Sequence, residues 1–269
     1  MIWAWGGALA VGLSLGLLGS GGAILTVPIL VYLVGHDEKV AIVESLAIVG
    51  VIAAVGAVRA IASRRADLRS GVLLAVPGIA GTTLGAALAR QVPGAVQLAM
   101  LAGLMGVAAA MMLRGRRNVP ESAPPSQGDS RAAMVVLQGG GLGVVTGLVG
   151  VGGGFLIVPL LVLLRGLPMS AAVGTSLFII AVNSAAGLVA HLAASSAAAG
   201  GVGASVDWGV VGLFAGLGVA GSLIGSHVAG RMPQDTLRRL FAVFLIAMAG
   251  YILLRQAPRV WPGLFGTGG

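Results

Sequence analysis

Two glycine-rich segments are the parts of this sequence whose spacing is best suited to hold a ligand. They run from Gly19 to Gly22 and from Gly150 to Gly154, and each interrupts a long uncharged stretch. Successive glycine amides can form a concave nest of N–H groups, and a helix that starts there adds the positive end of its dipole. Such breaks would bind a small anion without a buried arginine. The residues that we place at this site are Ser20, Gly21, Gly22, Gly152, Gly153 and Gly154. Glycines that only allow helices to pack closely are the alternative interpretation.

Hydroxyl and amide side chains follow each break and could complete the hydrogen bonds of such an anion. They are Ser45, Thr175 and Ser176, with Asn183 as a lesser candidate. The alternative for the hydroxyls is a bond to a backbone carbonyl one turn earlier, which is common for Ser and Thr in helices. Ser45 and Ser176 match each other when the two halves of the chain are aligned, and this favours a shared role for that pair.

Glu44 is the one carboxylate well inside an apolar run, and it is our candidate for a proton carrier. A charge at the centre of a membrane helix costs roughly 2.5–3.5 kcal/mol or more, so such residues are usually functional. The alternative, which we favour slightly, is that Glu44 lies within a turn of a loop and reaches water. His191 and His227 are lesser candidates, because lone histidines on small-residue helices more often serve packing or interfaces.

Composition indicates that most of the chain lies in lipid. Of its 269 residues, 57% are hydrophobic and only 9% are charged, and the mean hydropathy is +1.03. A soluble domain carries roughly 25% charged residues. Between the charges lie apolar runs of about 20 residues or more, the length that crosses a bilayer as a helix. The sequence therefore predicts an all-α integral membrane protein that passes through the bilayer several times.

Several classes of function fit the sequence poorly. The net charge of +8 would suggest nucleic acid in a soluble protein, but the basic residues here occupy short loops and form no stripe with exposed aromatics. The chain has no cysteine, which excludes disulfides, thiolate metal sites and cysteine nucleophiles. The glycine segments lack the preceding strand and the following acid of a dinucleotide site. We expect no cofactor, no metal, no nucleic-acid partner and no enzyme constellation.

The chain is built from two similar halves. When it is shifted onto itself so that Gly16 falls on Gly147, Pro28 falls on Pro159 and positions 12–33 give twelve identities in twenty-two. Matched prolines and an unchanged order of elements argue against a chance likeness of Gly- and Ala-rich helices. A polar, proline-rich stretch divides the halves. We predict a first repeat at 1–113, a cytoplasmic linker at 114–131 and a second repeat at 132–269.

Length and charge together predict that the two repeats are inverted. The first element of each half is too long for one crossing and is broken by glycines, so a hairpin of half-helices fits it better. Each half then consists of this broken hairpin and three transmembrane helices. With that arrangement twelve of the sixteen Lys and Arg residues fall on one side, against ten if every element crosses. The positive-inside rule therefore places 59–69, 114–131 and 231–239 in the cytoplasm and the chain ends outside or near the outer surface.

The sequence resembles the TauE/SafE family of sulfite exporter-like membrane permeases. The resemblance rests on the segment GLVGVGGGFLIVP at 147–159, on GTSL at 174–177 and on GLLGSGGAILTVP at 16–28, and it extends over nearly the whole chain. It implies transport of sulfite or organosulfur anions across the inner membrane. The first half departs from the second at Ser20 and Ala23, and Glu44-Ser45 stands in place of Thr175-Ser176.

The function that we expect is a secondary transporter that moves a small sulfur-containing anion across the bacterial inner membrane by alternating access. A channel, a transporter for another small solute, and a membrane-embedded enzyme or scaffold are the alternatives. The partners that we expect are the anion and the lipid bilayer, and a homodimer is left open.

Overall fold

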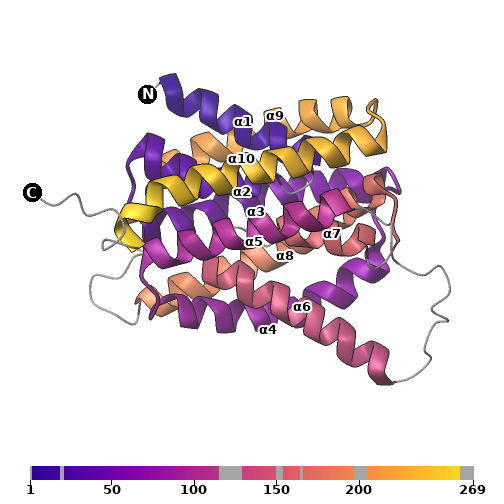
Figure 1. Ribbon diagram of the computed structural model, residues 1–269, viewed down its shortest axis with the longest axis horizontal. Coiled ribbons are helices and arrows are strands. Elements are labelled where there is room, and N and C mark those ends of the chain that lie inside the picture. The colour runs from indigo at the N-terminus through magenta and orange to yellow at the C-terminus, as the bar shows by residue number, and fades with distance from the viewer. Residues whose placement is uncertain are drawn as a thin grey trace, which may run out of the picture.

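The protein is an assembly of helices in the computed structural model, which describes residues 2–18, 21–114, 129–149, 154–163, 166–196 and 205–260 (Figure 1). Within these ranges there is no strand. The elements are α1 (Ile2–Leu18), α2 (Gly21–Ile29), the π-helical turn η1 (Leu30–Val34), α3 (Glu38–Ala62), α4 (Leu68–Ala89), α5 (Gly94–Arg114), α6 (Asp129–Val149), α7 (Gly154–Leu163), α8 (Met169–Ser196), α9 (Trp208–Ala229) and α10 (Gln234–Val260). The all-α class predicted from the sequence is confirmed.

The long first element of each half is divided near the glycine segment that predicts its break. Helix α1 ends at Leu18 and α2 begins at Gly21, whereas α6 ends at Val149 and α7 begins at Gly154. In the first half α2 folds back on α1. Gly22 of α2 lies so close to α1 that an added Cβ would overlap the carbonyl oxygen of Val11. Residues 19–20 and 150–153 lie outside the described part of the chain.

The half-helices α2 and α7 end in the same way. Gly35 and Gly166 both have left-handed backbone angles, with φ of 87° and 66°, a region that glycine occupies without strain. The next amide in each turn reaches back to a carbonyl six residues earlier. His36 N–H donates to Leu30 O at 3.0 Å, and Leu167 N–H donates to Leu161 O at 3.1 Å. These turns lead the chain directly into α3 and α8.

Five helices of the described chain are long and apolar enough to cross a membrane, namely α3, α4, α5, α8 and α9. Six crossings are expected from the sequence, and the sixth, α10, has a shorter described apolar part at Arg239–Leu254. Large apolar side chains cover the outer faces of these helices. Val58 is 68% exposed, Val76 is 62% exposed and Ile224 is 56% exposed. An apolar outer surface of this extent suits contact with lipid. Helices also satisfy their backbone hydrogen bonds internally, as segments in the hydrocarbon core must.

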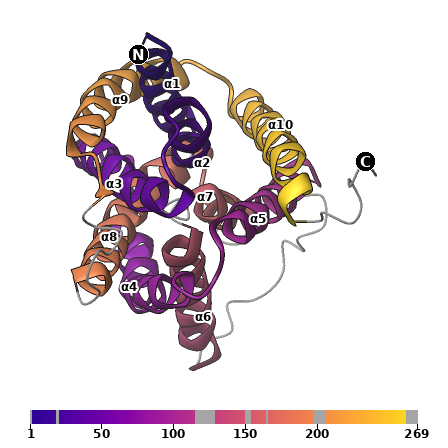
Figure 2. The ribbon, with the colours of Figure 1, turned by 90° about the vertical axis from the view of Figure 1, so that its left-hand side faces the viewer.

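The long helices of one half pack chiefly on long helices of the other half, whereas the half-helices α2 and α7 pack chiefly on α1 and α8 of their own half. Helix α1 lies along α9, and α4 lies along α6. Helix α3 packs on α8, and α5 packs on α10, so the halves are interleaved rather than side by side (Figure 2). In the alignment of the two halves α1 corresponds to α6 and α4 to α9. The pairs α1–α9 and α4–α6 are therefore the same contact made twice.

Glycines let the paired helices approach until their backbones touch. A Cβ at Gly16 of α1 would overlap the carbonyl oxygen of Ser222 on α9, and a Cβ at Gly147 of α6 would overlap that of Thr82 on α4. Close approach through small residues is how membrane helices gain packing energy when lipid supplies no hydrophobic driving force between them. The abundance of glycine, 46 residues, is thus explained in part by these two seams.

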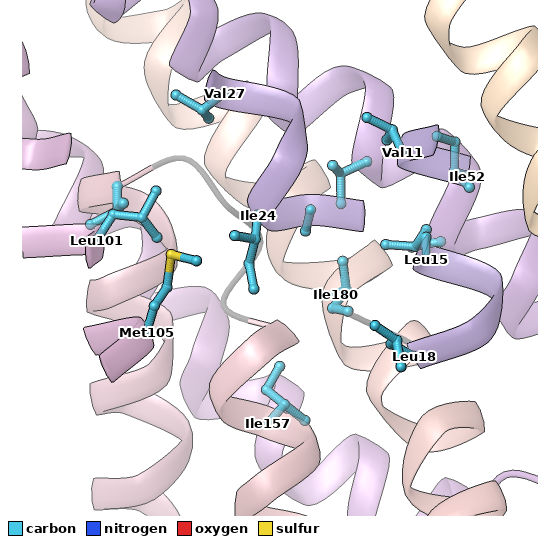
Figure 3. Close-up of a cluster of buried hydrophobic side chains, with 14 of the residues drawn as sticks. Val11, Leu15, Leu18, Ile24, Val27, Ile52, Leu101, Met105, Ile157 and Ile180 are labelled. Atoms are coloured by element: carbon cyan, nitrogen blue, oxygen red, sulfur yellow. The ribbon is translucent and has the colours of Figure 1, made fainter. Parts of the chain in front are cut away.

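An apolar cluster lies in the middle of the molecule. Ile24 of α2 and Ile157 of α7 are both fully buried, and Leu101 and Met105 of α5 lie beside them (Figure 3). Leu18, the last residue of α1, is drawn close to Ile180 of α8 in the same cluster. The half-helices therefore enter the centre of the bundle, as a break at membrane depth requires.

Between the halves, α5 continues to Arg114 and α6 begins at Asp129, so both helices extend into the stretch that we predict as a linker. Residues 115–128 lie outside the described chain. The division of the chain into 1–113, 114–131 and 132–269 stays a prediction.

Candidate functional site

The glycine breaks can be followed only in part. Ser20, Gly152 and Gly153 lie outside the described residues, and the predicted contribution of these three to an anion site stays a prediction. Gly21 and Gly154 are the first residues of α2 and α7, where the free N–H groups of a helix start are found. Gly22 is buried against the backbone of α1, which is the close-packing role that we gave as the alternative.

The matched serines make the same local bond in each half. Ser45 Oγ donates to Ile42 O at 2.9 Å, and Ser176 Oγ donates to Val173 O at 2.8 Å. Both hydroxyls are thus engaged with a carbonyl of their own helix, the pattern that we gave as the alternative to ligand binding. The two halves therefore resemble each other down to these side-chain hydrogen bonds.

The structure does not bring Ser45 and Ser176 together. Helices α3 and α8 are antiparallel, because Gly56 lies against Leu177 while Gly50 lies against Ser184. Ser176 therefore faces the last third of α3, whereas Ser45 lies near its start. At 1.5 Å per residue they are separated by roughly 18 Å along the helices.

Asn183, by contrast, lies near the middle of α8 and is fully buried. Neither its Oδ1 nor its Nδ2 has a hydrogen-bond partner among the described residues. Its amide faces α4, where a Cβ at Gly78 would come within 2.7 Å of Oδ1. The neighbouring hydroxyl of Ser184 is also buried and unpaired. The residue that matches Asn183 in the first half is the buried apolar Ile52, so only one half carries this amide.

Thr175 and Glu44 occupy matching positions and hold matching backbone groups. Thr175 Oγ1 accepts a hydrogen bond from the backbone N–H of Asp67 at 2.9 Å, and Glu44 Oε1 accepts one from that of Asp207 at 2.9 Å. Asp67 and Asp207 are the N-cap residues of α4 and α9, and each carboxylate accepts bonds from the first amides of its helix. Each central helix therefore holds the start of a helix from the other half.

Glu44 also has a second partner. Its Oε2 lies 2.6 Å from Nδ1 of His36, which is partly exposed, while Glu44 itself is 0% exposed. Our slightly favoured interpretation, that Glu44 reaches water at a loop, is therefore wrong. The turn at Gly35 folds His36 back over the start of α3 and shields the carboxylate. His36 is a residue that the sequence analysis missed, because eight positions of separation give no helical spacing that would join it to Glu44.

The comparison with known families decides the identity. A sequence model described as "Sulfite exporter TauE/SafE" matches residues 4–252. The chain belongs to the TauE/SafE family. Two relatives from Xylella fastidiosa, both named "Probable membrane transporter protein", are similar to it. The one from strain Temecula1 is 35% identical over 169 residues, and the one from strain 9a5c is 34% identical over 173 residues.

Both matches cover 62% of this chain and 64% of the relative, so the chain matches less than two thirds of the length of these relatives. No solved structure matches this TauE/SafE chain. The family match confirms the resemblance drawn from the sequence, and it agrees with the apolar helices of a multi-pass membrane protein.

The remaining polar candidates of this TauE/SafE protein have local roles. His191 Nε2 lies 2.9 Å from the carbonyl oxygen of Gly147, so this ring joins α8 to α6. His227 is exposed in the last turn of α9. Among the described residues no three His, Asp or Glu side chains are grouped as metal ligands would be.

Proposed function

We propose that this protein is a transporter that carries a small sulfur-containing anion, of the sulfite or organosulfonate type, across the bacterial inner membrane by alternating access. The observation that carries the proposal is the unpaired, buried amide of Asn183, which faces α4 near the middle of α8. The next residue, Ser184, is also buried and unpaired, and it lies against Gly50 of α3. The proposal's support from the family is the description of the matching sequence model, which is that of a sulfite exporter.

A buried polar group without a partner is costly, and this cost argues for a ligand. Leaving one buried donor or acceptor unpaired costs about 1–3 kcal/mol, whereas an apolar residue of the same shape avoids this. Ile52 in the matching position shows that an apolar side chain fits the first half. An amide retained in the second half is explained if a ligand pairs with it when bound. The Nδ2 group and a serine hydroxyl are neutral donors that suit the oxygens of a sulfur oxyanion.

The negative charge of the ligand needs more than neutral donors. In the part of the chain that the structure describes, no Lys or Arg is buried among the core residues. The remaining sources of positive potential are the starts of α2 and α7, at Gly21 and Gly154, where free amides and the helix dipole favour an anion. We therefore keep Ser20, Gly152 and Gly153, which flank those starts, in the proposed site.

Alternating access is supported by the way the halves are interleaved. Helices α3 and α8 match in the alignment, yet they run antiparallel, as the contacts of Gly56 with Leu177 and of Gly174 with Ala60 indicate. Matching helices of opposite direction are what inverted repeats produce. The proposal is that rocking of the two repeats exposes Asn183 to one side of the membrane and then to the other.

The test is transport by purified protein in liposomes, with labelled sulfite, methanesulfonate, sulfate and phosphate as separate solutes. Asn183→Leu should lower sulfite or sulfonate transport at least about tenfold, the effect of losing roughly 1.4 kcal/mol of binding. Its melting temperature should stay unchanged or rise, because an unpaired buried amide is removed.

Gln97→Leu is the control, since it removes a buried amide of α5 whose Nε2 donates to Ala89 O at 3.0 Å, although its Oε1 has no partner among the described residues. It should lower the melting temperature and leave the apparent affinity for the anion unchanged. Wild-type transport by Asn183→Leu would remove Asn183 from the site. A wild-type protein that moves phosphate but neither sulfur anion would overturn the proposed substrate class.

A further inference from the structure

A cavity opens at the end of the molecule where α3 ends, α8 begins and α9 ends. Its volume is about 610 Å³, within the usual range of small-molecule sites. The polar residues of its wall are Arg59, Arg65, Arg231, His227, Ser63, Ser170, Ser222 and Ser226. No Asp or Glu is among its described lining residues, so the three arginines give the cavity a positive potential.

The arginines of this cavity are weakly engaged. Arg59 Nη1 donates to Ser226 Oγ at a long 3.3 Å. Among the described residues, no hydrogen bond or ion pair holds the guanidinium of Arg65 or of Arg231. Guanidinium groups present a rigid fork of donors that matches two oxygens of an oxyanion. Three such groups around one hollow, none paired with a carboxylate there, form a site with the chemistry of an anion receptor.

The backbone near Arg65 is held in an unusual turn. Arg64 has φ of 53°, a left-handed angle that costs a residue with a side chain about 1–2 kcal/mol. The amide of Arg65 then returns to Ala60 O at 2.9 Å, which closes the end of α3. This turn directs Arg65 toward the end of α9, where its Nη1 lies 3.7 Å from the position that a Cβ of Gly230 would take.

The positive-inside rule alone does not account for this cavity. That rule explains why arginines gather at one end of the bundle, and Arg64 and Arg69 satisfy it without lining the hollow. At the other end the positions that match Arg59, Ser226 and Arg231 are the neutral Ala190, Ala86 and Gln91, and Arg90, which matches Gly230, is the one arginine among the positions that match the lining of the cavity. The receptor chemistry therefore occurs at one end of an otherwise repeated architecture.

The inner part of the cavity approaches the first break. Gly16 and Leu17, which precede the last residue of α1, line it together with Gly56 and Leu177. An anion with a small apolar group would thus meet arginines at the rim and aliphatic side chains further in.

We propose that this cavity is a loading vestibule that binds small sulfonate or sulfite-type oxyanions through Arg59, Arg65 and Arg231 before they enter the transport path. The place of the vestibule in a transport cycle rests on the proposed function. Its affinity for anions does not, and it can be measured separately.

Because the chain has no cysteine, a single reporter can be placed in the cavity. Ser170→Cys lies on its wall, and Ala62→Cys is an exposed control at the end of α3 outside it. Each purified protein is treated with the anionic 2-sulfonatoethyl methanethiosulfonate and with the cationic trimethylammonioethyl reagent. The ratio of anionic to cationic rate should be about tenfold or more higher at position 170 than at 62, since a charged cleft concentrates counter-ions 10- to 1,000-fold.

Arg59→Gln with Arg231→Gln should bring the ratio at position 170 close to that at 62. Arg64→Gln with Arg69→Gln, the same loss of charge outside the cavity, should leave it high. Unlabelled methanesulfonate should protect the introduced thiol of Ser170→Cys saturably. Equal ratios at the two positions, an unchanged ratio in the first double variant, or absence of protection would each overturn the vestibule. If these results hold while the wild-type protein transports no sulfur anion, the proposed function fails and the anion site stands.

Discussion

A threonine and a glutamate have the same structural role in the two halves, and a single substitution can measure it. Thr175→Val removes the acceptor of the Asp67 N–H and should lower the free energy of unfolding by about 1–3 kcal/mol, because a backbone donor at the start of α4 is left unpaired. Thr175→Ser keeps an acceptor and should cost less. Thermal unfolding of both variants in detergent is the measurement, and equal stability of Thr175→Val and wild type would contradict it.

Glu44 combines this structural role with a contact to His36. The effect of its charge therefore has to be measured separately from its effect on the position of α9. Glu44→Gln retains an oxygen that can accept from the Asp207 N–H, whereas Glu44→Ala retains none. Glu44→Gln should therefore be the more stable variant. If Glu44 carries protons, Glu44→Gln also abolishes the pH dependence of transport in liposomes. An unchanged pH profile, with Glu44→Ala destabilised, would assign Glu44 to positioning α9 alone.

At the scale of single residues, the sequence indicates which polar residues matter better than it predicts their hydrogen-bond partners. Aligning the halves identifies Glu44 as a departure from Thr175, but the shared function of the two depends on amides 163 and 108 residues away. Nothing local in the sequence indicates those distances. Asn183 is a candidate from the sequence whose role stays a prediction, and its burial and the absence of any partner for it among the described residues become visible only once α4 is packed against it.

At the scale of elements, the glycine seams give a prediction with an internal control. Gly16→Ala and Gly147→Ala place a methyl group on the backbones of α9 and α4, and each should lower stability by about 1–3 kcal/mol, the usual effect of overpacking. Gly106 of α5 is exposed with open space around it. Gly106→Ala should be neutral or stabilise by up to about 1 kcal/mol, since Ala is the better helix former. Thermal unfolding of the three variants is the measurement. Equal effects of the three substitutions would contradict the claim that backbone contact at Gly16 and Gly147 excludes a side chain.

Helix boundaries are the part of the fold that the sequence predicts well. Charged loops, glycine segments and prolines mark the ends of helices: α1 ends at Leu18 just before the segment Gly19–Gly22, and α6 ends at Val149 just before Gly150–Gly154, while Gly21 and Gly154 already begin α2 and α7. The partners of each helix are not predicted, because apolar runs of similar composition carry no information on which run packs against which. The interleaving of α1 with α9 and of α4 with α6 follows from where small residues match in three dimensions.

At the scale of the whole molecule, the arginine cavity shows why a basic loop in a membrane protein is easily underestimated. The sequence analysis assigns Arg59, Arg65 and Arg231 to topology, since charge counting treats every loop alike. Their meeting depends on the ends of α3 and α9, which lie in different halves, and on the start of α8. Only a packed structure brings them to one hollow.

The last prediction concerns the orientation of the two halves. Contacts at the two ends of the molecule show which loops lie at the same end. Arg59 bonds Ser226 at one end, whereas Lys39 Nζ donates to Arg90 O at 3.4 Å where α3 begins. The α3–α4 loop and the α9–α10 turn therefore share one end, and the α4–α5 turn lies at the other. The α4–α5 and α9–α10 turns match in the alignment, so parallel repeats would place them on the same side of the membrane, and inverted repeats place them on opposite sides.

Three cysteine variants test this, because the chain has no cysteine of its own. Ala66→Cys, Asp235→Cys and Gln91→Cys lie in or beside the α3–α4 loop, the α9–α10 turn and the α4–α5 turn. With an impermeant maleimide, Gln91→Cys should react on intact cells, while Ala66→Cys and Asp235→Cys should react only after permeabilisation, since the arginine-rich end belongs in the cytoplasm. Reaction of Asp235→Cys and Gln91→Cys from the same side would require parallel repeats, and a rocking motion between inverted halves could then not be the mechanism.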